Sequence, residues 1–183
     1  SLPVKLPVVS YQHGSVFGKE EVPSFLENST ETRLMVAVFG GQGYMVIGAD
    51  YFGKGVSPEP NGYIVKESTE QACLDMLLAA QTVCPDLGVE MGPLLLSGWS
   101  QGGWSTFVFL HKLQSVGIPV TAAAVASGPV DLYATINRWA NAWEPIDAAY
   151  IPPLQSNMIY AFEEYYGWPG LANWAIKPEY QEA

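Results

Sequence analysis

The chain has 183 residues, 49% of them hydrophobic, which suits one globular domain with a sizeable core. Its 18 acidic residues outnumber its 8 basic ones, and the formal net charge of -10 argues against a nucleic-acid or anionic-membrane surface, which needs clustered cations. No apolar run approaches the roughly 18 residues of a transmembrane helix, and the N-terminus lacks a signal-peptide pattern. We expect a soluble domain whose signal, if it is exported, has already been removed.

An extended, β-branched run at residues 3–10 predicts a first strand, which ends in a turn at 11–15. A His-Gly pair directly after a strand places backbone N–H groups in a tight turn at the carboxyl edge of the sheet. A donor to an oxyanion is needed at that edge. We therefore assign the role to the backbone around Gly14 and Ser15, and give the His13 side chain a structural role.

Residues 15–30 lack periodicity and predict a surface loop. An apolar run at 32–39 predicts a short helix that the glycines at 40–43 end, and 44–49 predict a second buried strand. Asp50 and spaced glycines follow this strand. We interpret Asp50 as a structural residue that fixes the turn through Asx-type hydrogen bonds.

A long helix is predicted from Ser68, which serves as the N-cap with Gln71 completing a capping box, and Pro85 lies beyond its end. Cys73 and Cys84 fall in and just after this helix. Eleven helical residues span about 16 Å, whereas a disulfide needs Cα atoms within about 7 Å, so we expect no bridge between them. Both cysteines are interpreted as small buried hydrophobic residues.

The apolar run at 93–97 leads into a G-x-S-x-G sequence centred on Ser100, and a helical pattern follows to about residue 116. Strand, sharp turn and helix in this order form a nucleophile elbow, and Ser100 is the candidate nucleophile. Gly98 and Gly102 are required because a Cβ at either position would meet the adjacent strand or helix. The alternative is a glycine-rich strand-to-helix turn with an ordinary serine.

Residues 120–127 predict a fourth buried strand. The four strands alternate with helical patterns and lack the polar alternation of a half-exposed sheet, which predicts an α/β fold with a parallel sheet covered by helices on both faces. Ligands of such sheets bind outside the carboxyl ends of the strands. His13, Asp50, Ser100 and Asp131 all fall at that edge.

The composition changes after Asp131: the segment 131–174 holds ten of the chain's 23 aromatic residues. A helix is predicted around 154–165, ended by Gly167 and Pro169. We divide the chain into a core at 1–130 and an aromatic-rich helical cap or lid at 131–183. The cap would wall an apolar substrate pocket, with these candidates: Trp99, Trp139, Trp143 and Tyr160. The alternative is an ordinary hydrophobic packing layer.

The catalytic base is missing from this pattern. A serine hydroxyl needs an imidazole within about 3 Å and a carboxylate that orients it, and after an elbow serine the acid and then the histidine are expected. His13 precedes Ser100, while His111 lies about three turns along the following helix, roughly 15 Å away. The sequence therefore supplies a nucleophile and an oxyanion hole, but no general base.

The segments 11–15, 22–24, 49–55 and 98–103 together resemble the α/β-hydrolase superfamily. Within it, the similarity is closest to the secreted lipases and esterases that include bacterial cell-wall-degrading esterases and fungal secretory lipases. It covers residues 3 to about 130 well and the cap more loosely. The resemblance implies that these strands are the third to sixth of an eight-stranded sheet, whose other strands, with the acid and the histidine, lie outside this chain.

The resemblance also implies roles for single residues. Ser100 is the nucleophile, the N–H of Gln101 is one oxyanion donor, and the second is that of Ser15 in preference to Gly14. Asp131 stands where some hydrolases place the acid, although this family is expected to have it later. The resemblance implies no metal or cofactor, and a secreted or periplasmic location.

We expect a serine carboxylic-ester hydrolase, an esterase or lipase that forms an acyl-enzyme on Ser100. Its partners are an ester substrate and a second polypeptide fragment of the same hydrolase, with neither nucleic acid nor a transmembrane segment. The aromatic cap favours an uncharged acyl or aryl ester. The alternatives are an α/β-hydrolase peptidase and a non-catalytic binding protein with the hydrolase fold.

Overall fold

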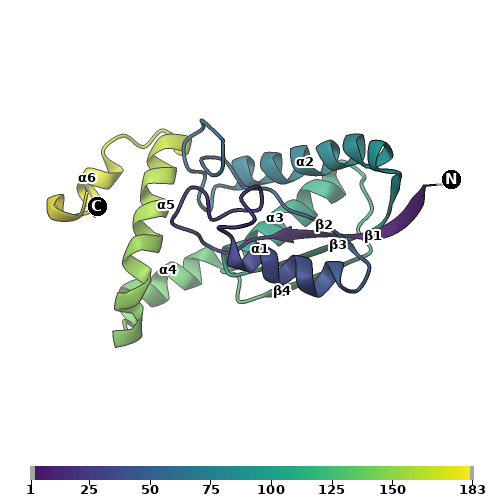
Figure 1. Cartoon of the computed structure of the whole chain (residues 1–183). Helices are drawn as coiled ribbons and strands as arrows, with labels where there is room; N and C mark the ends of the chain where they lie inside the picture. Colours follow the sequence, from purple (N-terminus) through teal and green to yellow (C-terminus); the bar gives the residue numbers. More distant parts are fainter. Residues whose placement is uncertain (1–2, 182–183) are drawn as a thin grey trace.

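The computed structural model describes residues 3–181 and contains a four-stranded parallel sheet (Figure 1). The strands are β1 (Val4–Gln12), β2 (Met45–Ile47), β3 (Val89–Trp99) and β4 (Ala122–Ala126), in the order β2-β1-β3-β4. In the centre of the sheet, Val9 of β1 pairs with Val46 of β2 and with Leu95 of β3, and Leu95 also pairs with Ala122 of β4. The predicted α/β class and parallel sheet are confirmed.

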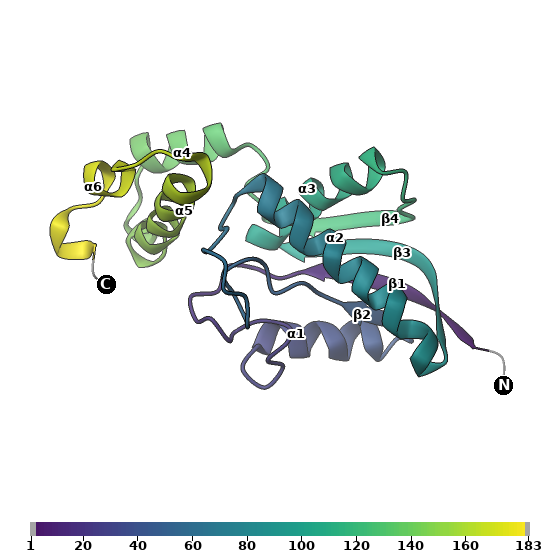
Figure 2. The same cartoon turned by 90° about the horizontal axis from the view of Figure 1, so that it is seen from above.

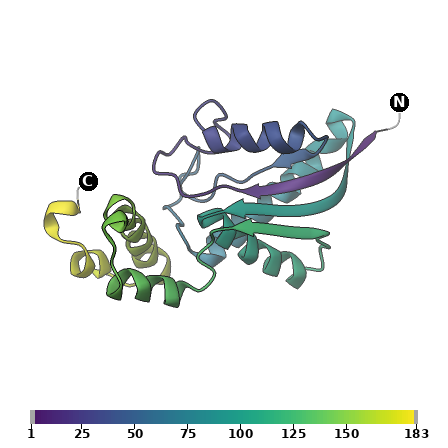
Figure 3. The same ribbon diagram turned by 90° about the horizontal axis from the view of Figure 1, so that it is seen from below.

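Helices connect the strands through crossovers. α1 (Thr30–Met35) continues as the π-helical segment η1 (Val36–Gly40) and leads to β2, α2 (Lys66–Val83) leads to β3, and α3 (Gln101–Ser115) leads to β4. Because the chain reverses its direction across the sheet at β2, right-handed crossovers put α1 on the opposite face from α2 and α3. Figure 1 shows α2 above the sheet and α1 below it, and Figure 3 shows the strands in front of α2 and α3.

Two helix starts differ from the predicted ones. α1 begins at Thr30, because Ser29 caps it by accepting the N–H of Thr32 at 3.3 Å. α2 begins at Lys66 with Val65 as its N-cap, so the predicted cap at Ser68 with a capping box from Gln71 is wrong. The Ser68 hydroxyl is buried inside the first turn and bonds to the backbone carbonyls of Gly62 and Val65 instead.

The prediction of a buried fourth strand is also wrong. β4 consists of alanines and one valine, and all but the partly buried Val125 are exposed. Within residues 3–181, β3 is its only partner strand, and small side chains cover little of the sheet. β4 is therefore an edge strand in this structure, and a polypeptide edge of this kind can pair with another strand.

The main core lies between the sheet and the helices α2 and α3. It is a cluster of these buried residues: Val8, Ala49, Tyr51, Cys73, Leu77, Leu94, Leu96, Phe109 and Leu113. Cys73 and Cys84 are both buried and both free, which confirms that they do not form a disulfide with each other. Burial raises the pKa of the Cys73 thiol to about 12.

The C-terminal part is helical and lies beyond the carboxyl ends of the strands (Figure 2). It comprises these elements: α4 (Leu132–Asn141), η3 (Pro145–Ala149), α5 (Ile151–Tyr166), α6 (Leu171–Ala175) and η4 (Pro178–Tyr180). Gly167 ends α5 in the left-handed conformation, at φ 64°. A second core cluster joins this layer to the rest, with Tyr63 and Trp104 packed against Met158 of α5.

Candidate active site

Ser100 occupies the sharp turn between β3 and α3 with φ 57° and ψ −123°. A non-glycine residue at positive φ costs on the order of 1–3 kcal/mol and persists only where its surroundings hold it. Here the N–H of Ser100 donates to the carbonyl of Ala126 at 2.9 Å, and the carbonyl of Ser100 accepts from the N–H of Gly103 at 3.0 Å. The end of β4 and the first turn of α3 thus hold the serine in its strained conformation.

The glycines of the motif permit very close backbone packing. A Cβ on Gly102 would lie 1.8 Å from the carbonyl oxygen of Gln12, and one on Gly98 would lie 2.3 Å from the carbonyl oxygen of Gly102. These neighbours are backbone atoms, so a side chain at either position would force the backbone itself to shift. The end of β1 therefore runs directly against the first turn of α3, and the turn that follows β1 lies beside the serine elbow.

Hydrogen bonds hold the turn after β1 from several sides. The hydroxyl of Tyr51 donates to the carbonyl of His13 at 3.2 Å. The N–H of Gly14 donates to both carboxylate oxygens of Glu31, at 2.9 and 3.2 Å. The hydroxyls of Ser15 and Tyr63 lie 2.9 Å apart. We call residues 13–15 the oxyanion turn, because the sequence predicts oxyanion donors at Gly14 and Ser15.

The His13 side chain is part of this scaffold. It is 1% exposed and stacks on the ring of Tyr51, with the ring centroids 4.3 Å apart. Its Nδ1 lies 2.8 Å from the carbonyl oxygen of Gly14 and its Nε2 lies 3.2 Å from that of Asp50. Burial lowers its pKa, against the opposing effect of these carbonyls. Both ring nitrogens face backbone carbonyls, so this imidazole is not available to Ser100 as a base.

Asp50 and Lys54 fix the segments that flank the turn. The Asp50 carboxylate accepts the N–H of Ser24 at 2.9 Å and also its hydroxyl. Lys54 is largely buried, and its ammonium group donates to the carbonyls of Val16 and Phe17 at 3.0 and 3.2 Å. Burial lowers the pKa of Lys54. Within residues 3–181 the Asp50 carboxylate makes no hydrogen bond to the serine motif, and both side chains hold loops.

His111 and Asp131 lie elsewhere. His111 is on α3 with its side chain 67% exposed, and its Nδ1 is 3.7 Å from the carboxylate of Glu70 on α2. Asp131 is the N-cap of α4, and its carboxylate accepts the N–H of Ala134 at 2.8 Å. Across residues 3–181, no hydrogen bond joins an imidazole to the Ser100 hydroxyl.

The four aromatic residues predicted to line a pocket are spread over several elements. Trp99 and Trp143 are each about half exposed, and Trp139 on α4 is partly buried. Tyr160 is exposed, and its hydroxyl donates to the carbonyl of Gln181 at 3.1 Å. In the described part of the C-terminal helical layer, the rings that contact one another lie at and just after the end of α5: Phe162, Tyr166 and Trp168.

The residues that sequence reasoning missed are Glu31, Lys54 and Tyr63. Each contacts the oxyanion turn or the residues directly after it, from 17 to 48 positions away in the chain. Glu31 lies just inside α1, where an acidic residue needs no explanation beyond the helix N-terminus. A contact over such a separation leaves no local pattern, so the sequence held no signal for these three.

Two further properties bear on what the site could hold. In the part of the chain that the structure describes, no group of three or more His, Cys, Asp or Glu side chains is arranged for a metal ion. Over the same residues, none of the helices is both long enough and apolar enough to cross a membrane.

The comparisons with known proteins bear on the fold. A protein from Legionella pneumophila, assigned as a hydrolase, superposes with a TM-score of 0.79 and 28% sequence identity over 90% of this chain and 44% of its own. The chain has the α/β-hydrolase fold. No family model matches it, and no curated protein matches its sequence.

Two esterase and lipase structures share this fold. The rice cell wall degrading esterase LipA from Xanthomonas oryzae superposes with a TM-score of 0.70 and 23% identity over 88% of this chain and 44% of its own. Lipase A of Candida antarctica gives a TM-score of 0.51 at 18% identity, over 70% of this chain and 32% of its own. The chain spans less than half the length of these proteins.

Proposed function

We propose that this chain carries the nucleophile and the oxyanion hole of a serine hydrolase that cleaves carboxylic esters. The observation that supports this most is the backbone of Ser100, which has a positive φ at the centre of a G-x-S-x-G turn between β3 and α3. Strain of this kind is found at functional sites, and it holds the hydroxyl out at the carboxyl edge of the sheet. The hydrolase fold of the structural neighbours agrees with this role.

Two backbone N–H groups are proposed as the oxyanion hole. Gln101 is the first residue of α3, and no acceptor within residues 3–181 takes its N–H. The N–H of Ser15 is likewise without an acceptor among these residues, whereas that of Gly14 is bound by Glu31. Donors of this kind stabilise the negative charge on the carbonyl oxygen when Ser100 Oγ attacks the ester carbon.

The reaction then needs a base from outside the described residues. In the proposed sequence, a histidine takes the Ser100 proton and passes it to the departing alcohol, and water later hydrolyses the acyl-enzyme. We propose that a second polypeptide part of the same hydrolase supplies this histidine and its acid. The chain spans only 44% of its Legionella neighbour, which leaves room for such a part.

The helical cap is proposed to cover the active site and to bind the acyl or aryl part of the substrate. Helices α4–α6 lie beyond the carboxyl ends of the strands, where a lid would cover Ser100 (Figure 2). With the core at 1–130 and this cap at 131–183, the exposed aromatic side chains Trp99 and Trp143 would face an uncharged acyl or aryl group. A secreted or periplasmic enzyme would fit the neighbouring cell-wall-degrading esterase.

The experiment is covalent labelling of the native protein. The protein is incubated with a fluorophosphonate, denatured, and its intact masses are measured, followed by peptide mapping. We expect one adduct on Ser100, none in Ser100→Ala, and a second polypeptide that contains a histidine. Labelling of a different serine, or none while the second polypeptide is present, would contradict the proposal.

A different outcome would favour the second candidate function, a binding protein with the hydrolase fold. The absence of an imidazole beside Ser100 among the described residues supports that candidate. It predicts that the 183-residue chain is found alone and stays unlabelled. An enzyme that labels on Ser100 but turns over only amides would be a peptidase, which a panel of matched esters and amides distinguishes.

A further inference from the structure

The carboxylate of Glu31 connects the oxyanion turn to α1. Its Oε1 accepts the hydroxyl of Tyr11 at 2.7 Å and the N–H of Gly14 at 2.9 Å, and its Oε2 lies 3.2 Å from the same N–H. Tyr11 is buried in β1, so its hydroxyl holds the carboxylate from the sheet side. Glu31 is thus fixed at both ends: by its backbone in α1 and by two donors at its carboxylate.

These contacts fix the orientation of the peptide groups in the oxyanion turn, and so the directions of their N–H and C=O bonds. The plane between His13 and Gly14 is held at both ends, by Tyr51 at its carbonyl and by Glu31 at its N–H. The carbonyl of Gly14 faces Nδ1 of His13 at 2.8 Å. Because a trans peptide points its N–H away from its carbonyl, the N–H of Ser15 must point away from the His13 ring.

The turn also lies against the elbow. A Cβ on Gly14 would lie 3.4 Å from the carbonyl oxygen of Trp99, the residue before Ser100, and 3.2 Å from Oε2 of Glu31. Gly14 is therefore placed between the carboxylate and the elbow. Any rotation of this residue would move the N–H of Ser15 relative to the serine nucleophile.

We propose that Glu31 is a positioning residue of the oxyanion hole: by binding the N–H of Gly14, it directs the following N–H, that of Ser15, to the substrate oxygen. The inference rests on the ester hydrolase function proposed above and deepens it. Glu31 does not touch the substrate. Because Glu31 occupies the N–H of Gly14, the N–H groups of Ser15 and Gln101 are the two that remain free to bind the substrate oxygen.

The test compares Glu31→Ala and Glu31→Gln in the complete native protein. We expect Glu31→Ala to lower kcat about tenfold to hundredfold with KM within about twofold, because an oxyanion donor acts mainly in the transition state. Glu31→Gln should stay within about threefold of the wild type, since an amide oxygen in the place of Oε1 can still accept from both the Tyr11 hydroxyl and the N–H of Gly14. Hydrogen–deuterium exchange in segment 11–17 should also be faster in Glu31→Ala than in Glu31→Gln.

Glu90→Ala is the matched control. Glu90 on β3 forms an ion pair with Lys5 on β1 at 2.8 Å, at the ends of these strands that lie far from the oxyanion turn. It should keep the wild-type kcat. A Glu31→Ala enzyme with kcat within twofold of the wild type would overturn the positioning role and leave the proposed function standing. A faster Glu31→Ala enzyme would also overturn it, because Glu31 would then compete with the substrate for Gly14. If the wild type shows no turnover that depends on Ser100, the proposed function itself fails.

Discussion

The hydroxyls of Tyr63 and Ser15 lie 2.9 Å apart, so the loop before α2 contacts the oxyanion turn directly. Tyr63 also belongs to the buried cluster that includes Met158 of α5. Its neighbour Ile64 has φ 56°, which is a strained conformation for a β-branched residue, and it is buried in the same cluster. One short segment therefore contacts both the helical layer and the candidate site.

Removing the Tyr63 hydroxyl should weaken the turn without opening the core. We expect Tyr63→Phe to lower kcat for ester hydrolysis about threefold to tenfold and to reduce the free energy of unfolding by about 1 kcal/mol, the value of one hydrogen bond. Steady-state kinetics and urea denaturation measure the two effects. Tyr133→Phe is a suitable control, because its ring is 81% exposed on α4. An unchanged kcat in Tyr63→Phe would show that the contact plays no part in the reaction.

Gly102 should not tolerate a side chain. In Gly102→Ala the new Cβ would lie 1.8 Å from the carbonyl oxygen of Gln12, so the first turn of α3 and the end of β1 would have to shift apart. We expect a loss of at least about 3 kcal/mol in the free energy of unfolding, at the upper end of what overpacking costs. Urea denaturation, followed by circular dichroism, measures it.

Gly117 provides the comparison. It has φ 74° and open space where a Cβ would be, so Gly117→Ala suffers only from the backbone conformation, at about 1 kcal/mol. Equal losses in the two variants would mean that β1 and α3 can move apart, and that the close contact at the elbow is not rigid.

Local patterns predicted the elbow well because its determinants are local. The apolar strand, the glycines around Ser100 and the following helix are adjacent in sequence, and their geometry follows from the crowding of one turn. The predicted start of α2 at Ser68 failed for the opposite reason. The Ser68 hydroxyl had other acceptors, the carbonyls of Gly62 and Val65, once the chain had folded around it.

The residues that hold the site could not be predicted in the same way. Glu31 and Tyr63 reach the oxyanion turn across a helix and a long loop, so only the fold brings them there. The burial of β4 was misjudged because an apolar composition does not say whether a neighbour covers the strand. Sequence reasoning therefore predicted the strand, turn and helix around Ser100 and missed the residues that hold the neighbouring turn.

Cys73 should be chemically inert in the native protein. It is completely buried among the core residues, and burial raises its pKa to about 12, so almost no thiolate exists at neutral pH. We expect iodoacetamide at pH 8 to leave Cys73 unmodified in the native protein and to modify it fully in urea. Mass spectrometry of the digested protein measures this. Rapid native modification would show that α2 opens locally.

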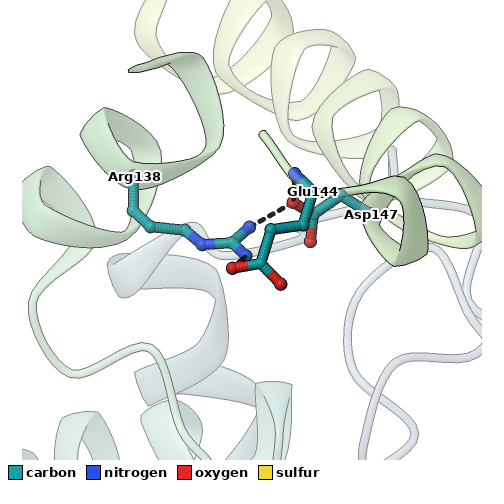
Figure 4. A network of polar contacts seen from close by, with 3 residues as sticks. All are labelled: Arg138, Glu144 and Asp147. Carbon is teal, nitrogen blue, oxygen red and sulfur yellow. Dashed lines mark hydrogen bonds and ion pairs between the residues drawn. The ribbon is translucent and has the colours of Figure 1, made fainter. Parts of the chain in front are cut away.

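An ion pair connects α4 to η3 (Figure 4). The Asp147 carboxylate accepts from the Arg138 guanidinium and from the N–H of Glu144, at 2.8 Å, and its side chain is 1% exposed. Burial alone would raise the pKa of Asp147, but the Glu144 N–H and the Arg138 charge outweigh it, and its pKa lies below the usual value. The folded state therefore binds a proton at Asp147 less readily than the unfolded chain does.

This difference sets the sign of the pH dependence. A carboxyl with a lowered pKa in the folded state stabilises it fully above the unfolded value, near pH 3.9, and loses this contribution as the pH falls through the folded value. We expect the midpoint of urea unfolding to fall on acidification below about pH 4 in the wild type, and to fall less in Asp147→Asn. Arg138→Ala should be destabilised already at pH 7, because it leaves a buried carboxylate without its cation. Equal acid profiles for the wild type and Asp147→Asn would mean that other carboxylates carry the effect.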